Sequence, residues 1–375
     1  MSKIGMRNAW FQVHKWIGLL LAVLIIPLSV TGAALVWDDA LDHALNPQRY
    51  ATSGSGLLPM QRYVAAARGV LARGDRIASL ALPAAAGEPV IVVASVAAKP
   101  KRMAGPPPRK TVWIDPATAR VLDSAGSGGG LIRTFHMIHG SLMIPGVGRQ
   151  VVGWIGVAML VSSLSGLWLW WPTVGRWVRG LRWRRHRNID TNLHHLLGFW
   201  IALPLFVLSL TGAWISFPQV FGGAQGGVQG GAGGRPGARP GGQRPLPLAT
   251  PKLALDAVIA RGIAASPGAI TKIDWPTDQK PVWKIALAQG DRAITVADDD
   301  GTAKLVPPPR EPLARTMRRI HDGTGMGLVW QILIFLGGLL PAILAVTGII
   351  MWWRSRGWRA QLKARQRARV EAVAT

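Results

Sequence analysis

The sequence predicts a membrane α-helical protein, with four transmembrane helices from a duplicated helical hairpin and two small α+β units outside the membrane. Three observations support this fold class. Four apolar runs contain no Asp, Glu, Lys, Arg or His, they recur as two copies of one pattern, and a helix-then-strands pattern follows the first run of each copy. Each run has about the 20 residues that cross ~30 Å of hydrocarbon. The runs cover residues 16–37, 151–171, 196–217 and 328–353.

The duplication is visible without gaps in the first and third runs. The stretch from His14, HKWIGLLLAVLIIPLSVTGAALVW, recurs from His194 as HHLLGFWIALPLFVLSLTGAWISF. Because repeats decide architecture, the chain is read as two related halves. Each half carries one histidine near each end of its hairpin. The second and fourth runs correspond through Arg133 with Arg315, His139 with His321, Gly166 with Gly348, and Trp170 with Trp352.

The pattern divides the chain into nine segments. The first half comprises the N-terminus with the first span (1–37), an α+β unit (38–132), an outer helix with the second span (133–171) and a basic loop (172–193). The second half comprises the third span (194–217), a Gly/Pro-rich insert (218–250), an α+β unit (251–314), an outer helix with the fourth span (315–353) and a basic tail (354–375). The insert is too poor in apolar residues to offset the entropy of ordering, which predicts a flexible linker. A mobile basic flap over an anionic ligand is the alternative.

Each α+β unit is predicted to be one helix followed by an antiparallel meander. Apolar residues at helical spacing cover 57–73 and 253–265. Asp115-Pro116 and the turn at 298–301 mark equivalent reversals before the last strand of each unit. The predicted strands are 77–82, 90–96, 111–114 and 120–122 in the first unit, and 270–275, 282–287, 293–297 and 303–306 in the second.

The charge distribution predicts the topology. The net charge of +25 is concentrated in the loop between the second and third runs and after the fourth run. This is the positive-inside pattern, so both termini and the loop 172–192 are placed in the cytoplasm, with 38–150 and 218–327 outside. The same distribution argues against nucleic acid as a partner and for the lipid bilayer. The chain has no cysteine, so iron–sulfur clusters held by thiolates and covalent haem are excluded.

Four membrane-edge histidines carry the chemical signal, because such residues are costly and are usually functional. His14 and His194 are predicted to offer two imidazoles to one haem iron near the cytoplasmic face, and His139 and His321 to a second haem near the outer face. Any haem bound by these pairs must be non-covalent. Eighteen residues make five helical turns, so Gly32 shares a face with His14, where a small residue lets a flat macrocycle or a neighbouring helix approach closely. No catalytic residue is assigned beyond these ligands.

Other polar residues near these positions have weaker assignments. His136 forms H-x-x-H with His139, but its counterpart is Arg318, so it is predicted to lie near the outer haem without being an axial ligand. His195 is about 100° around the helix from His194, and the duplication selects His194. Arg133 and Arg315 are candidate partners of haem propionates, or else snorkelling residues at the interface. A zinc site is less favoured because no Cys or carboxylate clusters with the histidines.

These motifs resemble the PepSY-associated transmembrane helix family, whose members are often called iron-regulated membrane proteins. The resemblance rests on the H-x-x-x-G openings at His14 and His194, the I-H-G at His139, the endings SGLWLWW and TGIIMWW, and the VWIDPAT hairpin. It covers nearly the whole chain apart from the insert and the basic tail. It implies PepSY-like periplasmic units on a bacterial inner-membrane protein. As in FoxB-like ferrisiderophore reductases, which carry b-type haem, it implies two non-covalent haem b groups. It also implies reduction of a ferric siderophore in the periplasm with release of Fe(II).

The donor of the electrons is left open between the quinol pool and a cytoplasmic protein. No G-x-G-x-x-G follows a predicted strand, so the chain itself is not expected to bind a dinucleotide. A function of another class also remains, in which the helices anchor non-enzymatic PepSY units that bind or inhibit a periplasmic partner. A plain anchor does not require four histidines in paired register, which favours the reductase.

Overall fold

The computed structural model describes residues 2–97, 108–127, 129–171, 178, 181–182, 186–221, 245–288, 292–307 and 313–374. Most of the Gly/Pro-rich insert therefore lies outside the described residues. The chain forms two compact units. A helical unit comprises 1–38, 134–226 and 313–375, and a sheet unit comprises 39–133 and 227–312.

Four long helices form the helical unit, and each is long and apolar enough to cross a membrane. The predicted four spans are therefore confirmed, although α1 and α6 begin well before their apolar runs, so that His14 and His194 lie inside helices. The last helix also continues through the segment predicted as a basic tail. The four are α1 (Lys3–Leu35), α5 (Gly148–Trp170), α6 (Ile189–Ser216) and α10 (Leu328–Ala374).

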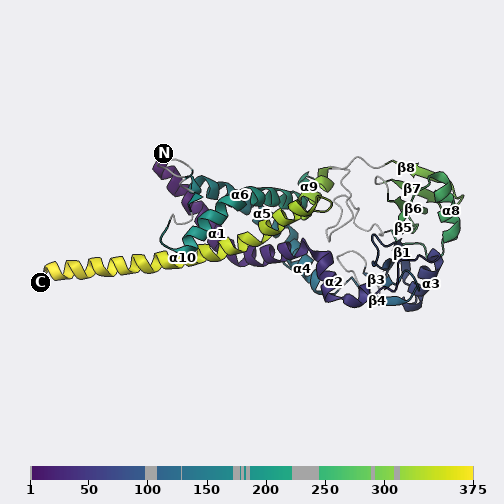
Figure 1. The fold of residues 1–375 in the computed structure, drawn as a ribbon. Helices are drawn as coiled ribbons and strands as arrows, with labels where there is room; N and C mark the ends of the chain where they lie inside the picture. Colours follow the sequence, from purple (N-terminus) through teal and green to yellow (C-terminus); the bar gives the residue numbers. More distant parts are fainter. Residues whose placement is uncertain are drawn as a thin grey trace. The chain divides into compact units, whose positions relative to one another are not determined.

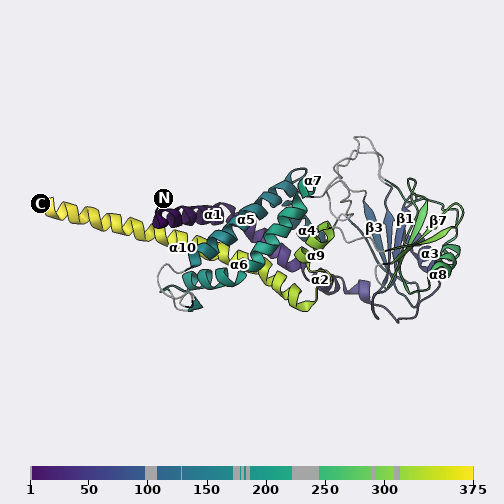
Figure 2. The ribbon, with the colours of Figure 1, turned by 90° about the horizontal axis from the view of Figure 1, so that it is seen from above.

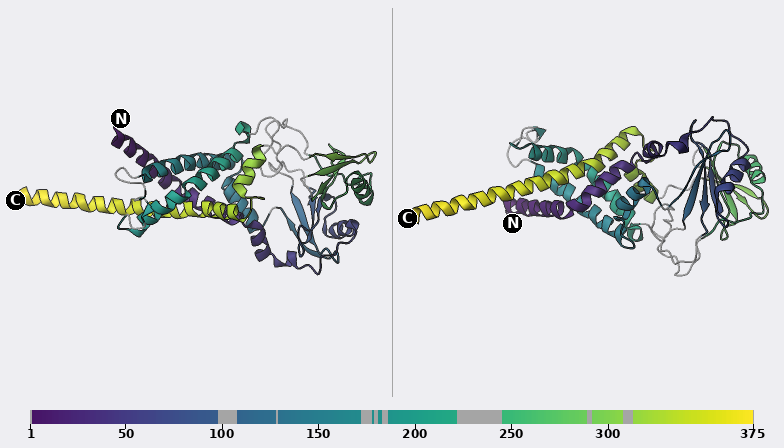
Figure 3. Two further views of the ribbon diagram at one scale, coloured as in Figure 1. Left: turned by 45° about the horizontal axis from the view of Figure 1, so that its top comes forward. Right: turned by 90° about the horizontal axis from the view of Figure 1, so that it is seen from below.

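The long helices lie side by side in one bundle (Figures 1 and 3). Their contacts make a ring in the order α1, α5, α6, α10 and back to α1. Helices α1 and α6 are therefore diagonal partners across the centre of the unit, as are α5 and α10. Short helices α4 (Leu131–Ser141) and α9 (Leu313–Asp322) precede α5 and α10, and α9 packs on α6. Two further short helices, α2 (Asp38–Leu45) and α7 (Pro218–Phe221), follow α1 and α6.

The sheet unit contains one antiparallel sheet of eight strands in the order β4-β3-β2-β1-β5-β6-β7-β8. The two meanders were predicted as separate units. They are instead joined edge to edge, because β1 pairs with β5 through Ser79–Asp274, Leu80–Ile273 and Ala81–Lys272. The strands are β1 (Arg76–Ala81), β2 (Val90–Ser95), β3 (Arg109–Ile114), β4 (Val121–Gly126), β5 (Ile270–Asp274), β6 (Val282–Leu287), β7 (Ala293–Ala297) and β8 (Ala303–Val306).

One face of this sheet is covered by two helices, α3 (Met60–Val70) and α8 (Leu255–Ala265), as Figure 2 shows. Alternate residues of each strand point to this face, which gives a single core shared by both meanders. Tyr63 of α3 and Trp283 of β6 are its largest fully buried side chains. The Tyr63 hydroxyl donates to the carbonyl of Pro116 at 2.7 Å, which satisfies its buried polar group.

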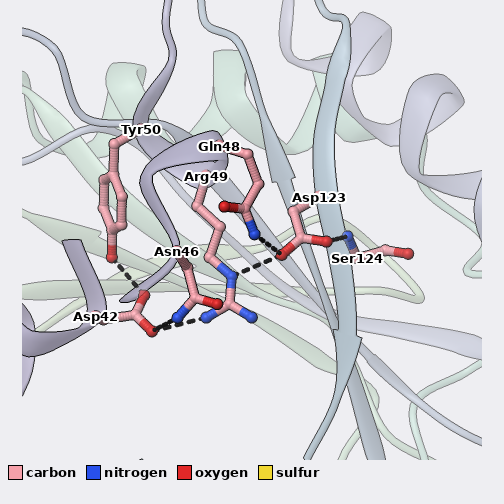
Figure 4. A network of polar contacts seen from close by, with 7 residues as sticks. All are labelled: Asp42, Asn46, Gln48, Arg49, Tyr50, Asp123 and Ser124. Atoms are coloured by element: carbon pink, nitrogen blue, oxygen red, sulfur yellow. Dashed lines mark hydrogen bonds and ion pairs between the residues drawn. The ribbon is translucent and has the colours of Figure 1, made fainter. Parts of the chain in front are cut away.

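On the first meander, Arg49 ties the segment after α1 to the sheet (Figure 4). It lies in a 3-10 helix, η1 (Pro47–Tyr50), and its guanidinium bonds Asp42 of α2 and Asp123 of β4, each at 2.7 Å. The same group stacks on Trp113 of β3, 4.0 Å from the ring centre. Desolvation raises the pKa of Asp123, but hydrogen bonds from Arg49 and Ser124 outweigh it and hold this pKa below its usual value.

We predict that Arg49→Ala lowers the stability of the sheet unit by about 2 kcal/mol, because it leaves Asp42 and Asp123 with unpaired, largely buried charge. Lys272→Ala is the control, since it breaks an ion pair with Asp274 whose side chains are 46% and 39% exposed. That pair is worth at most about 1 kcal/mol. Thermal unfolding of the full chain in detergent measures both, and equal shifts in the two variants would contradict the prediction.

Candidate functional site

The first histidine pair, His14 and His194, lies between the diagonal helices α1 and α6. The two ring centres are 6.3 Å apart and the ring planes stand at 87°. The pair predicted from the duplication is therefore brought together in the structure. His195, the neighbour of His194, stacks instead on His186 at 4.6 Å.

The second histidine pair, His139 and His321, comes from the short helices α4 and α9. Its ring centres are 6.0 Å apart and its planes are inclined at 37°. These two helices are equivalent in the two halves of the chain. The structure thus contains two facing imidazole pairs, and each pair draws one histidine from each half.

Three of the four imidazoles bond a backbone carbonyl of a neighbouring helix through Nδ1. A carbonyl can only accept a hydrogen bond, so Nδ1 must carry the hydrogen and Nε2 keeps a free lone pair. This is the tautomer that binds a metal through Nε2. The three bonds are His14 to Ser162 O at 3.1 Å, His139 to Leu28 O at 2.9 Å, and His321 to Leu208 O at 3.1 Å.

The fourth imidazole, His194, reaches the same state through a hydroxyl. Its Nδ1 lies 2.9 Å from Thr347 Oγ1. That hydroxyl donates its only hydrogen within its own helix, to Ile343 O at 2.9 Å and Leu344 O at 3.1 Å. It can therefore only accept from the ring, and Nδ1 of His194 is again the protonated nitrogen.

Glycines make room for the imidazoles against the helices. A glycine stands four residues after each carbonyl that accepts a hydrogen bond from a histidine. A side chain at that position would cover the carbonyl. These glycines are Gly32, Gly166 and Gly212. A methyl group on Gly32 would lie 2.5 Å from His139, and one on Gly166 or Gly212 would lie 3.0 Å from His14 or His321. Gly32 was predicted to let a flat macrocycle or a neighbouring helix approach the face that it shares with His14. The structure places His139 of the short helix α4 against it.

The groups that contact the imidazoles also share a sequence pattern, which the comparison of the two halves did not identify. Each apolar run holds a single Ser-Gly or Thr-Gly dipeptide, and each dipeptide faces one of the four histidines. Its glycine leaves the helix surface open and its hydroxyl residue stands beside the imidazole or the carbonyl. The dipeptides are Thr31-Gly32, Ser165-Gly166, Thr211-Gly212 and Thr347-Gly348.

Comparison with known proteins supports the family. A family model described as PepSY-associated TM region matches residues 11–355. The chain belongs to the PepSY-associated TM family. The match includes all four histidines of the two pairs and all four dipeptides. A comparison with curated proteins gives no match.

In this PepSY-associated TM protein the surroundings of the second pair favour the neutral form of both imidazoles. Desolvation, together with the smaller effects of His139 and Arg318, lowers the pKa of His321 to about 4, and the charge of Asp322 and the hydrogen bond to Leu208 oppose this shift only in part. Desolvation also lowers the pKa of His139, and the charge of His136 adds to this effect. Neutral rings are the form in which histidine ligates a metal.

The remaining predicted residues are more exposed. Arg133, Arg315 and His136 are exposed, and Arg133 belongs to the sheet unit, so their assignment as propionate partners or near neighbours stays a prediction. Arg318 is half-buried one helical turn before His321. Within the described residues, no three His, Cys, Asp or Glu side chains gather into a metal-binding group. Each histidine pair therefore offers two protein donors.

Replacement of the glycines should have graded effects on stability. Gly32→Ala is expected to cost about 1–3 kcal/mol, because the methyl group overlaps the His139 ring. At Gly348 a methyl group would lie 3.5 Å from His194, an ordinary contact. Gly348→Ala should therefore be neutral or gain up to about 1 kcal/mol of helix propensity. Unfolding midpoints of the purified full chain compare the two, and a larger loss for Gly348→Ala would contradict the packing described.

Proposed function

We propose that this protein is a haem-dependent ferric-chelate reductase of a bacterial inner membrane. It binds two non-covalent haem b groups. Electrons enter from the cytoplasmic side or from the quinol pool and reach a ferric siderophore in the periplasm, where Fe(II) is released. The proposal rests on the two histidine pairs, in which the facing imidazole rings have centres 6.3 Å and 6.0 Å apart.

The spacing of each pair fits two axial ligands of one iron. An imidazole nitrogen lies about 2.0 Å from the metal it binds, and about 1.1 Å from its own ring centre. Two imidazoles on opposite sides of one metal therefore hold their ring centres about 6 Å apart. Among the described residues each pair offers two protein donors. A bound haem would supply the remaining ligands of the iron from its porphyrin.

The residues around each pair support the same assignment. The Nδ1 hydrogen bonds hold Nε2 free to coordinate iron and orient the ring, as partners of metal-bound histidine do. Gly32, Gly166 and Gly212 let three of the four rings approach a neighbouring helix closely. The alternative is a zinc ion in each pair, but a zinc site would be expected to have at least a third protein ligand. The paired arrangement favours haem.

The two pairs lie at different depths along the same helices. Leu28, which accepts from His139, follows His14 by 14 residues on α1, and Leu208 follows His194 by the same interval on α6. Fourteen residues of helix span about 21 Å. The positive-inside rule puts the first pair near the cytoplasmic face and the second pair near the periplasm.

Bound haem supplies a one-electron carrier at each level. The protein's contribution is to hold the axial imidazoles, fix their tautomer and keep the interior apolar between the two levels. One electron reduces the ferric chelate to Fe(II), which hard oxygen ligands hold far more weakly than Fe(III). No proton transfer or bond cleavage in the chelator is needed, so the siderophore is expected to be released intact.

Haem content tests the ligand assignment. His14→Ala or His194→Ala should lose about half of the haem per chain, and so should His139→Ala, which empties the other level. His136→Ala is the matched control one turn away and should retain both haems. The pyridine haemochrome absorbance per protein gives the count. If His136→Ala lost haem and His139→Ala did not, the assignment from the duplication would be wrong.

Electron transfer tests the activity. The purified protein is reduced chemically, excess reductant is removed, and a ferric siderophore is added with an Fe(II)-trapping dye. We expect the haem to reoxidise as the coloured Fe(II) complex forms. Haem that stays reduced with a panel of ferric chelates would reject the reductase and favour a binding module with PepSY units.

A further inference from the structure

Three of the four dipeptide hydroxyls contact an imidazole directly. Their oxygens lie within hydrogen-bond distance of Nδ1, in addition to the backbone carbonyl at His14 and His321 and as the partner already described at His194. The contacts are Ser165 Oγ to His14 at 3.1 Å, Thr211 Oγ1 to His321 at 3.1 Å, and Thr347 Oγ1 to His194 at 2.9 Å.

These hydroxyls are fixed as acceptors by their own helices. Thr211 Oγ1 donates to Val207 O at 2.8 Å, and Ser165 Oγ donates to Ser162 O at 3.1 Å. Thr347 does the same toward Ile343. Because each hydroxyl has one hydrogen and it is used, a lone pair faces the imidazole. Thr211 and Thr347 are buried, at 2% and 6% exposure, so water does not compete for these bonds.

The structure assigns Ser165, Thr211 and Thr347 as positioning residues that set the basicity and orientation of the haem-ligating imidazoles. The assignment rests on the proposed function. The hydroxyl is a second acceptor on Nδ1–H of His14 and His321, and it takes the place of the carbonyl at His194. An acceptor there withdraws that hydrogen and places more electron density on Nε2, which makes the imidazole a stronger donor to iron. A stronger donor stabilises Fe(III) over Fe(II) and lowers the reduction potential of the haem.

The chain supplies its own control in Thr31. It occupies the same place in its dipeptide and is equally buried, at 4% exposure. Its hydroxyl donates to Pro27 O at 2.6 Å and to Leu28 O at 3.3 Å. Among the hydrogen bonds of the described residues, none joins Thr31 to His139, whose Nδ1 bonds the Leu28 carbonyl alone. A valine at residue 31 therefore removes a hydroxyl of the same kind without removing an imidazole partner.

The experiment compares Thr347→Val with Thr31→Val. For each variant, the reduction potential is measured for the haem nearest to the substituted residue. Redox titration of Thr347→Val in a His139→Ala background reports only the first pair, and Thr31→Val in a His14→Ala background reports only the second. Thr347→Val should raise the reduction potential and weaken haem retention by roughly 10–100-fold. Thr31→Val should change neither, and Thr347→Ser should restore the parent potential because it keeps the hydroxyl. Thr211→Val, read at the second pair, repeats the test if Thr347→Val does not fold.

The outcomes separate this inference from the proposed function. Equal potentials in Thr347→Val and its parent, or a shift in Thr31→Val as large as in Thr347→Val, would overturn the role of the hydroxyls while leaving the haem protein intact. Failure of Thr347→Ser to restore the potential would also overturn it. A parent protein with no haem absorbance after expression with haem supplied would reject the proposed function itself, and this inference with it.

Discussion

The helical unit depends on one constraint, which is that an imidazole held in an apolar bundle must find a partner for its Nδ1 hydrogen. A buried donor without an acceptor costs about 1–3 kcal/mol. Helix carbonyls are already engaged, and side chains normally cover them. For His14, His139 and His321 the chain resolves this with a glycine four residues beyond the accepting carbonyl, as with Gly32 and Leu28 or Gly212 and Leu208. For His194 it uses the Thr347 hydroxyl. The close approach that results also joins each histidine's helix to its neighbour.

This arrangement links the duplication to the ring of helices. His14 on α1 forms its hydrogen bond with α5, and His194 on α6 forms its hydrogen bond with α10, so each half supplies both a histidine and its hydrogen-bond partner. Because α1 and α6 are diagonal, the two rings meet at the centre of the bundle instead of at a helix–helix seam. Between the two pairs, α1 and α5 contribute an aliphatic cluster of Ile25, Leu28 and Ile155. Such a layer contains no group that carries protons, which suits a protein proposed to move electrons alone.

The sheet unit shows the same duplication with a different result. Each half forms one helix and a four-stranded meander, but neither meander keeps its first strand as an edge. Pairing of β1 with β5 covers both edges and merges the two apolar faces into one core. Unpaired strand edges are liable to aggregate, so the merger removes two such edges. Arg49 then fixes the chain segment after α1 onto β3 and β4.

The sequence by itself determined the four spans, the two helix-and-meander patterns and the two histidine pairs. Local signals were sufficient there: strands β6, β7 and β8 begin and end at the predicted residues because turns and alternation bound them, and His14 with His194 follows from register alone. The tertiary structure decided which elements touch. The β1–β5 pairing, the placement of Gly32 against His139, and the choice of Thr347 but not Thr31 as a hydroxyl partner depend on distances between segments far apart in the chain. Hydropathy and spacing report on one helix or strand at a time, whereas a hydrogen bond across the bundle depends on how two helices are rotated and offset against each other.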